Sequence, residues 1–368
     1  MGIDHSDALV FFGATGDLAY KQIFPALQAL ARRGRLEVPI IGVAKSGWTL
    51  EQLQARARKS LEEHGGVDEA AFARLITRLR YLDADYNDEA TYTRLREMLG
   101  EAKRPAFYLA IPPGLFSTVA TGLGHSGCAR GGRVILEKPF GRDLESARAL
   151  NQALRVVFDE AHIFRIDHYL GALRPLDAAE LVRGQFTGYR SEAGVLPEST
   201  VETFAALRLH IDSWRWEGAP FFLRAGKKMP VTMTEVIVRF KRPPLSKIPR
   251  GDSNYIRLRL GPEVAIGIGA RVKKPGEGSA SVQTELDVMH YPEGDAMTPY
   301  ERLLGDAMAG DPMLFATEEG VEAAWSIVEP ILGNATPLRD YAPGSWGPEE
   351  AAALTEAHGG WFEAELTP

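Results

Sequence analysis

An aspartate, a histidine and a tyrosine stand side by side in the string RIDHYLG, residues 165–171. A carboxylate next to an imidazole is a combination that can transfer protons. Two other strings place charged or rigid residues after short apolar runs, LEKPFG at 136–141 and LAIPPG at 109–114. Taken alone, Lys138 could belong to a surface ion pair and His168 could be a core histidine. Three such strings in one chain indicate an active site.

The string ALVFFGATGDLAYKQIFPAL, which begins at Ala8, has the pattern of a strand, a glycine turn and a helix. Gly13 permits a tight turn, Gly16 lets the backbone approach a diphosphate, and Ala19 is small enough for close packing of helix on strand. The first N–H groups of such a helix attract phosphates. The spacing is G-x-x-G-x-x-A, which an ordinary glycine turn could also have. Because this turn follows the first strand and opens a helix, we predict a dinucleotide-binding site.

The second apolar run, PIIGVAKSGWT at 39–49, indicates which dinucleotide binds. An acidic residue at the end of this strand would accept hydrogen bonds from the ribose 2′-hydroxyl of NAD and repel a 2′-phosphate. The chain instead has Lys45 there, with Ser46 and Thr49 close by. We therefore predict NADP as the cofactor and keep NAD as an alternative, because a lysine does not fork over a phosphate as an arginine does. The other interpretation of Lys45 is a solvated strand end.

These residues need a scaffold that brings the ends of several strands together. In the first half, short apolar runs alternate with stretches that have apolar residues at three- and four-residue spacing, which predicts an α/β Rossmann-type doubly wound parallel sheet. The predicted strands are 8–13, 39–44, 79–85, 106–111, 132–137 and 162–167. Ligands bind beyond the carboxyl ends of such strands. There Pro112 would rigidify a turn near the nicotinamide, Lys138 would point into the cleft, and Asp167 and His168 would end the last strand.

The second half of the chain has six strand-like runs close together in sequence. In NYIRLRLG, Ile256, Leu258 and Leu260 alternate with arginines, as in a sheet with one wet face. Connections this short favour antiparallel pairing, and the helical patterns PYERLLGDAMAG and EEGVEAAWSIVEPIL follow the strands. We predict a nucleotide-binding domain over residues 1–172 and an α+β domain with a largely antiparallel sheet over residues 173–368.

The composition excludes several classes of protein. The chain has 368 residues, of which 45% are apolar and 25% charged, as in globular proteins. The net charge of −7, with both signs interspersed, argues against nucleic-acid binding. No apolar run approaches the ~20 residues of a membrane span, and the N-terminus lacks a secretory pattern. The single cysteine, Cys128, cannot form an intrachain disulfide and fits a cytoplasmic location. We predict no metal ligands.

Seven strings together resemble the glucose-6-phosphate dehydrogenase family, from the first strand to the tail. They are GATGDLAYKQIFPAL, FYLAIPPGLF, LEKPFGRDLESARALN, FRIDHYLG, FAALRLHIDSWRWEGAPFFLRAGKKM, YERLLGDAM and GSWGP. The resemblance implies oxidation of glucose 6-phosphate at C1 to 6-phosphogluconolactone, with hydride transfer to NADP or NAD, as the first step of the pentose phosphate pathway. It also implies association of chains through the second-domain sheet, as a dimer or tetramer.

The resemblance assigns roles to individual residues. Lys138 matches a lysine that contacts both cofactor and sugar, Asp167 matches the aspartate that orients the catalytic histidine, and Lys45 stands where the family usually has arginine. The residues implied to bind the substrate are Lys138, His168, Tyr169 and Lys227. The residues implied to bind the cofactor are Gly13, Ala14, Thr15, Gly16, Asp17, Leu18, Lys21, Lys45, Pro112 and Lys138. Thr232 stands where many relatives have a second basic residue.

Part of the family's pattern is missing after RIDHYLG. Relatives continue with a lysine and then for roughly a hundred residues, about one small domain, before a VRGQ string. Here Ala172 follows, and Leu181 to Gln185 come almost at once. The missing segment is expected to hold the histidine that removes the C1 hydroxyl proton, a step in which a positioned base contributes ~10²–10⁴-fold. Of the residues that remain, Asp167 could act as the base if burial raised its pKa, and His210 is a weaker candidate.

Three functions therefore stay open. The chain could be a shortened glucose-6-phosphate dehydrogenase that acts on its sugar phosphate. It could be a non-catalytic NADP-binding relative without the general base. It could also be an enzyme of the glucose–fructose oxidoreductase type, a family that likewise pairs a nucleotide fold with an open antiparallel sheet.

Overall fold

The computed structural model describes residues 5–166, 173–241, 253–276, 281–289 and 297–363. Asp167, His168 and Tyr169 therefore lie outside the described residues. The chain divides into two compact units, unit 1 (Met1–Gly171 with Met297–Glu329) and unit 2 (Ala172–Ala296 with Pro330–Pro368). This division differs from the predicted domains, 1–172 and 173–368, in the residues 297–329, which return to unit 1.

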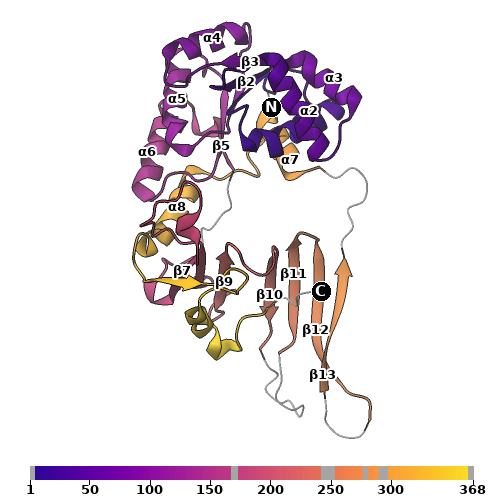
Figure 1. Cartoon of the computed structure of the whole chain (residues 1–368), viewed down its shortest axis with the longest axis vertical. Coiled ribbons are helices and arrows are strands. Elements are labelled where there is room, and N and C mark those ends of the chain that lie inside the picture. The colour runs from indigo at the N-terminus through magenta and orange to yellow at the C-terminus, as the bar shows by residue number, and fades with distance from the viewer. Residues whose placement is uncertain (1–4, 167–172, 242–252, 277–280, 290–296, 364–368) are drawn as a thin grey trace. The chain divides into compact units, whose positions relative to one another are not determined.

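Unit 1 contains a six-stranded sheet in the order β3-β2-β1-β4-β5-β6, and all its pairs are parallel (Figure 1). The strands are β1 (Ala8–Phe12), β2 (Ile40–Ala44), β3 (Leu79–Asp83), β4 (Pro105–Leu109), β5 (Arg133–Glu137) and β6 (Ile163–Ile166). Every residue of β1, β2 and β4 is buried, which explains why these strands have continuous apolar sequences. The six predicted strands and the doubly wound Rossmann-type sheet are confirmed.

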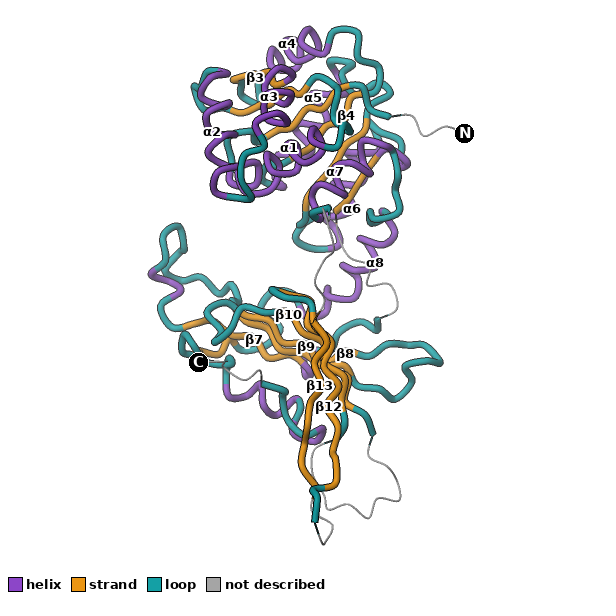
Figure 2. Tube along the Cα trace, turned by 90° about the vertical axis from the view of Figure 1, so that its right-hand side faces the viewer, coloured by secondary structure: helices purple, strands orange, loops and turns teal. Residues whose placement is uncertain are grey.

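Helices cover both faces of this sheet (Figure 2). One face packs against α1 (Phe24–Arg32), α2 (Leu50–Glu63), α3 (Glu69–Arg78) and α7 (Pro299–Ala309). The other face packs against α4 (Glu89–Leu99), α5 (Phe116–His125), α6 (Leu144–Arg155) and α8 (Glu318–Val328). The buried Glu301 of α7 pairs with Arg33 at 2.5 Å, and Trp325 of α8 donates a hydrogen bond to the Phe140 carbonyl at 2.7 Å. Among the described residues, no helix is long and apolar enough to cross a membrane.

Unit 2 contains two four-stranded sheets, in the orders β14-β7-β8-β9 and β10-β11-β12-β13. The strands are β7 (Leu181–Phe186), β8 (Phe204–Leu209), β9 (Phe221–Gly226), β10 (Thr234–Arg239), β11 (Tyr255–Gly261), β12 (Ala265–Lys273), β13 (Ser281–Met289) and β14 (Leu338–Tyr341). Pairing is antiparallel except between β14 and β7. The six predicted strands of the second half are β8 to β13, and the largely antiparallel sheet is confirmed.

The sheet β10-β11-β12-β13 has one apolar and one charged face, as the alternation in NYIRLRLG predicts. Its strand register aligns apolar residues in two rows. One row is Val238, Ile256, Ile268 and Leu286, and the next is Val236, Leu258, Ile266 and Val288. Ile268 is 48% exposed and Leu286 is 68% exposed. The apolar face of this sheet is therefore substantially open in the described part of the single chain.

Candidate active site

The order of the sheet in unit 1 reverses between β1 and β4, and this is where open α/β sheets bind ligands. Gly13 follows β1 at this point, with a positive φ of 79°. A Cβ atom at Gly13 would lie 2.0 Å from the backbone oxygen of Ala110, which follows β4. The Gly13 N–H donates to the Val43 carbonyl at 2.9 Å and to the Tyr86 hydroxyl at 3.0 Å. Only glycine fits this turn, and Pro112 lies exposed on the β4 side.

The predicted glycine turn opens a helical segment, as expected for a phosphate-binding loop. The Gly16 N–H donates to the Gly13 carbonyl at 2.9 Å, and a five-residue π-helical stretch, Ala19–Ile23, leads into α1. Gly16 and Asp17 are exposed, so the first N–H groups of this segment are accessible to a ligand. Lys21 also lies at the surface, 3.4 Å from the Asp17 carboxylate, which partly offsets its charge.

The loop between β2 and α2 is held beside the glycine turn. The hydroxyls of Ser46 and Thr15 are 2.7 Å apart. Asp83, at the end of β3, accepts hydrogen bonds from the N–H groups of Ser46 at 2.8 Å and Gly47 at 2.9 Å. The Ser46 N–H makes the largest contribution to lowering the pKa of Asp83. The Thr49 hydroxyl caps α2 by accepting a hydrogen bond from the Gln52 N–H. The hydroxyls at the glycine turn are therefore those of Thr15 and Ser46.

Lys45 does not stand alone at the end of β2. Its Nζ lies 2.6 Å from Oδ2 of Asp85, which follows β3. The other carboxylate oxygen, Oδ1, accepts hydrogen bonds from the backbone and side-chain nitrogens of Asn87 at 2.9 and 3.0 Å. The bond from Lys45 is the main cause that lowers the pKa of Asp85 to about 2, and the same bond raises the pKa of Lys45. Sequence reasoning missed Asp85, although the string DAD at 83–85 ends a strand that neighbours β2.

The end of β5 separates an inward carboxylate from an outward cation. The Glu137 carboxylate accepts a 2.5 Å hydrogen bond from the Tyr108 hydroxyl. Burial, and to a smaller extent the charge of Glu137, raises the pKa of Tyr108 well above its usual value. Burial and Glu137 also raise the pKa of Tyr300 to about 12. Lys138 is exposed, and its peptide bond to Pro139 is cis. Lys138 is therefore accessible at the same edge of the sheet as the glycine turn.

Arg165 fixes the strand that leads to Asp167. Its side chain is 1% exposed, and its guanidinium contacts both carboxylate oxygens of Glu160 at 2.6 and 3.1 Å and Oδ1 of Asn151 at 3.0 Å. The Arg165 carbonyl accepts a hydrogen bond from the Ala316 N–H at 2.9 Å. The predicted positions of Asp167, His168 and Tyr169 stay predictions, because these three residues lie outside the described part of the chain.

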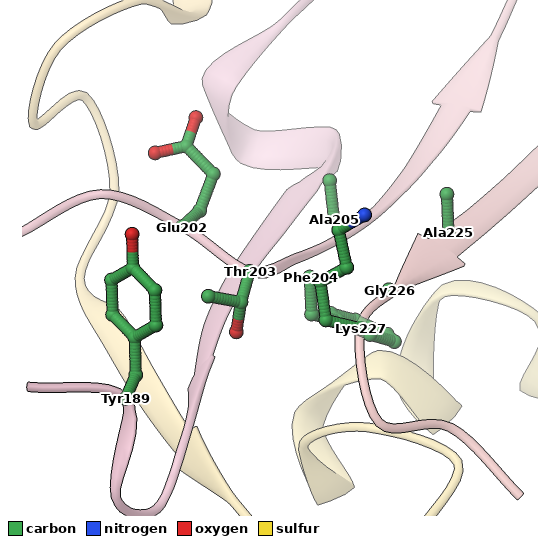
Figure 3. Close-up of a pocket in the computed structure, with 8 residues that line it drawn as sticks. All are labelled: Tyr189, Glu202, Thr203, Phe204, Ala205, Ala225, Gly226 and Lys227. Carbon is green, nitrogen blue, oxygen red and sulfur yellow. The ribbon is translucent and has the colours of Figure 1, made fainter. Parts of the chain in front are cut away.

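Lys227, the predicted substrate ligand of unit 2, follows β9 and lines an open pocket of about 460 Å³ together with Tyr189, Glu202 and Thr203 (Figure 3). Its N–H donates to the Thr203 carbonyl at 2.8 Å, while its carbonyl accepts from the Tyr341 hydroxyl at 2.7 Å. The backbone at Lys227 is therefore fixed and its side chain is exposed.

Two other positions singled out in the sequence also lie in unit 2. Thr232 is exposed just before β10. His210 follows β8, and its Nε2 lies 3.0 Å from Oε2 of Glu180. A carboxylate partner of this kind orients the imidazole of many general bases.

Comparisons with known proteins match the whole length of these two units. The family model described as glucose-6-phosphate dehydrogenase, NAD binding domain, matches residues 10–173, and the C-terminal domain of the same family matches residues 164–363. Glucose-6-phosphate 1-dehydrogenase 1 of Mycobacterium tuberculosis is 35% identical over 97% of this chain and 96% of that protein. The corresponding protein of Aggregatibacter actinomycetemcomitans is 29% identical over 95% and 96%.

A solved structure has the same arrangement of elements. The crystal structure of glucose-6-phosphate 1-dehydrogenase from Mycobacterium avium matches with a TM-score of 0.85 at 34% identity, covering 99% of this chain and 100% of that one. The alignment with the Mycobacterium tuberculosis protein runs over 451 positions, whereas this chain has 368 residues. That relative therefore carries residues that have no counterpart here. This agrees with the prediction that a segment of the family's sequence is missing from this chain.

Proposed function

Because the chain belongs to the glucose-6-phosphate dehydrogenase family, we propose that it oxidises glucose 6-phosphate at C1 to 6-phosphogluconolactone, with NADP as the hydride acceptor. The observation that carries this proposal is the glycine turn at the point where the strand order reverses between β1 and β4, where a Cβ atom at Gly13 would lie 2.0 Å from the Ala110 oxygen. Family membership leaves the glucose–fructose oxidoreductase alternative without support.

The residues around the glycine turn fit a dinucleotide with a 2′-phosphate. The turn is shaped by the internal bonds of the Gly13, Ala14 and Gly16 N–H groups, and the N–H groups at the start of the helical segment, Asp17 and Leu18, suit a diphosphate. The hydroxyls of Thr15 and Ser46 and the ammonium of Lys45 suit the adenosine end. When bound, NADP would supply the hydride acceptor. The roles of this chain's residues are to hold the diphosphate, to present Lys138 to cofactor and sugar, and to bind the substrate through His168, Tyr169 and Lys227.

The proton of the C1 hydroxyl needs an acceptor as the hydride leaves. Asp167 is our first candidate, since the family pattern places it next to the reacting hydroxyl's usual base. Turnover that survives in Asp167→Asn would exclude this role. His210 is the second candidate, because Glu180 gives it the carboxylate partner that a general base uses.

A second function, non-catalytic NADP binding, is favoured by one observation. The relative from Mycobacterium tuberculosis aligns over more positions than this chain has residues, and the residues absent here include, by the family pattern, the histidine base. A chain that binds NADP without that base would keep the cofactor site and lose most of its rate.

A spectrophotometric assay of NADP reduction tests both functions. The dehydrogenase proposal predicts turnover with glucose 6-phosphate and none with free glucose, and a version with the missing segment restored should turn over about 10²–10⁴-fold faster if that segment supplies the base. Calorimetric binding of NADP without turnover would favour the non-catalytic function. Failure to bind NADP would contradict both.

We also propose that the chain forms a homo-oligomer through the apolar face of the sheet β10-β11-β12-β13. Six of the eight residues in its two cross-strand rows are between 39% and 68% exposed, and contiguous exposed apolar residues mark an interaction site. Ile268→Glu should therefore shift the protein to a smaller species in sedimentation equilibrium. Lys273→Glu, on the opposite face of the same strand, is the control and should leave the species unchanged. A wild-type monomer at high concentration would contradict the proposal.

A cytoplasmic location is our further proposal. Cys128 is the only cysteine, it is buried and free, and its thiol contacts the Tyr92 carbonyl at 3.6 Å. Burial raises the pKa of this thiol, which makes it unreactive, and a chain without disulfides suits a reducing compartment.

A further inference from the structure

We propose that Asp85 determines how strongly this chain distinguishes NADP from NAD: it pairs with Lys45, weakens the attraction of a 2′-phosphate, and serves as the acceptor for the ribose 2′-hydroxyl of NAD. The inference rests on the proposed dinucleotide site and goes beyond it by naming the residue that sets cofactor preference. It predicts a site that accepts both cofactors.

The fold brings Asp85 to the place where NAD-binding sheets usually carry an acid. That acid normally ends the second strand, and β2 ends without one, at Ala44 followed by Lys45. However, β3 pairs with β2 in parallel, with Ala44 opposite Asp83, and the Ala84 N–H donates to the Ala44 carbonyl at 2.9 Å. The residues after both strands therefore emerge side by side. The carboxylate that β2 lacks is supplied by the neighbouring strand.

Asp85 is the fixed member of the pair with Lys45. Its Oδ1 is held by two hydrogen bonds from Asn87, independently of the contact that Oδ2 makes with the lysine. Its side chain is 36% exposed, whereas that of Lys45 is 70% exposed. The lysine ammonium can therefore turn toward a ligand, while the carboxylate stays where it is.

The other carboxylate at this edge is already engaged. Asp83 binds the N–H groups of Ser46 and Gly47 and the Tyr81 hydroxyl, the last at 3.0 Å. Asp83 therefore shapes the loop, which leaves Asp85 as the carboxylate that pairs with Lys45 at the end of β2. Asp85 is ionised at neutral pH, as an ordinary aspartate is, and Lys45 and Asn87 lower its pKa further, to about 2.

The electrostatic consequence differs for the two cofactors. A 2′-phosphate carries about −1.5 to −2 charges at neutral pH, so it gains attraction from Lys45 and meets repulsion from Asp85. Because Lys45 and Asp85 are in contact, the attraction of the phosphate by Lys45 is opposed by its repulsion from Asp85. The free 2′-hydroxyl of NAD carries no charge and can donate a hydrogen bond to the Asp85 carboxylate. The pair therefore lowers affinity for NADP and raises affinity for NAD, compared with a lysine alone.

Calorimetric titration with NADP and with NAD, in the absence of sugar, tests the inference. Asp85→Asn keeps an oxygen for the Asn87 hydrogen bonds and removes the charge. It should tighten NADP binding and weaken NAD binding, each by about fivefold. The dissociation constant for NAD divided by that for NADP should thus rise by about 25-fold. Asp85→Glu, which keeps the charge, should stay within about threefold of the wild-type ratio.

Glu101→Gln is the control for net charge. Glu101 is exposed and precedes β4, so it lies toward the amino ends of the strands, and its removal should change neither constant. An unchanged ratio in Asp85→Asn would overturn the inference. If Asp85→Asn fails to fold, Asp85→Ser provides the same test. Because only binding is measured, a chain that does not oxidise glucose 6-phosphate can still support the inference. An active chain whose ratio of dissociation constants is unchanged in Asp85→Asn would contradict the inference and leave the proposed function intact.

Discussion

Replacing Gly13 with alanine is expected to weaken NADP binding by about 10²-fold and to destabilise unit 1 by about 3 kcal/mol. Two causes act together. The φ of Gly13 is +79°, a conformation that costs other residues free energy, and the new Cβ would lie 2.0 Å from the Ala110 oxygen. Either β1 or β4 must move at its carboxyl end. That movement would displace the N–H groups that we propose to hold the diphosphate.

Gly34→Ala separates these two causes. Gly34 also has a positive φ, +69°, and no atom lies within 4 Å of the position its Cβ would take. This control should cost only about 1 kcal/mol of unfolding free energy and leave NADP affinity unchanged. Denaturant unfolding and calorimetry on both variants provide the comparison. If Gly13→Ala bound NADP with wild-type affinity, the turn between β1 and β4 would not be the cofactor site.

Arg165→Met is expected to destabilise unit 1 by about 2–3 kcal/mol, because it leaves the buried Asn151 oxygen without a donor and removes a charged hydrogen-bond donor from Glu160, which is 38% exposed. Methionine replaces much of the volume of Arg165. It removes both guanidinium hydrogen bonds to Glu160, whose Oε1 keeps the bond from the Glu318 N–H, and it leaves Oδ1 of the buried Asn151 without its donor. The strand β6 would lose this hydrogen bond to α6. Guanidinium unfolding of the whole chain measures the effect.

Arg155→Met is the matched control in the same helix–helix region. Arg155 is 55% exposed and pairs with Glu318 at 3.3 Å, so its loss should cost no more than about 1 kcal/mol. Equal destabilisation by the two substitutions would show that burial of Arg165 is not what matters.

The architecture could be predicted where the sequence carries strong local periodicity. The continuous apolar runs of unit 1 and the alternation in β11 both correspond to observed strands. The position of the last two helices could not be predicted, because their apolar faces do not reveal which surface they cover. Leu304 of α7 packs with Leu27 and Leu30 of α1, and this partnership between distant segments has no local signal. The strand β14, which pairs in parallel with β7, was missed for the same reason.

The candidate site was predictable where one segment forms it. The glycine turn is contained in a single strand–turn–helix string, so its conformation could be predicted from the spacing of its own residues. The environment of Lys45 depends on two strands, and Asp85 could enter the prediction only through the order of the sheet. Which cofactor a strand end accepts is therefore a property of neighbouring strands as much as of the strand itself.

The return of residues 297–329 to unit 1 affects how the chain can be made. During translation the glycine turn and all six parallel strands leave the ribosome first, but the helices that cover Leu27 on one face and α6 on the other follow only after most of unit 2. Until then the nascent chain exposes apolar surface on both sides of its first sheet. The last step in assembling the nucleotide-binding unit is thus delayed until nearly the whole polypeptide has been synthesised.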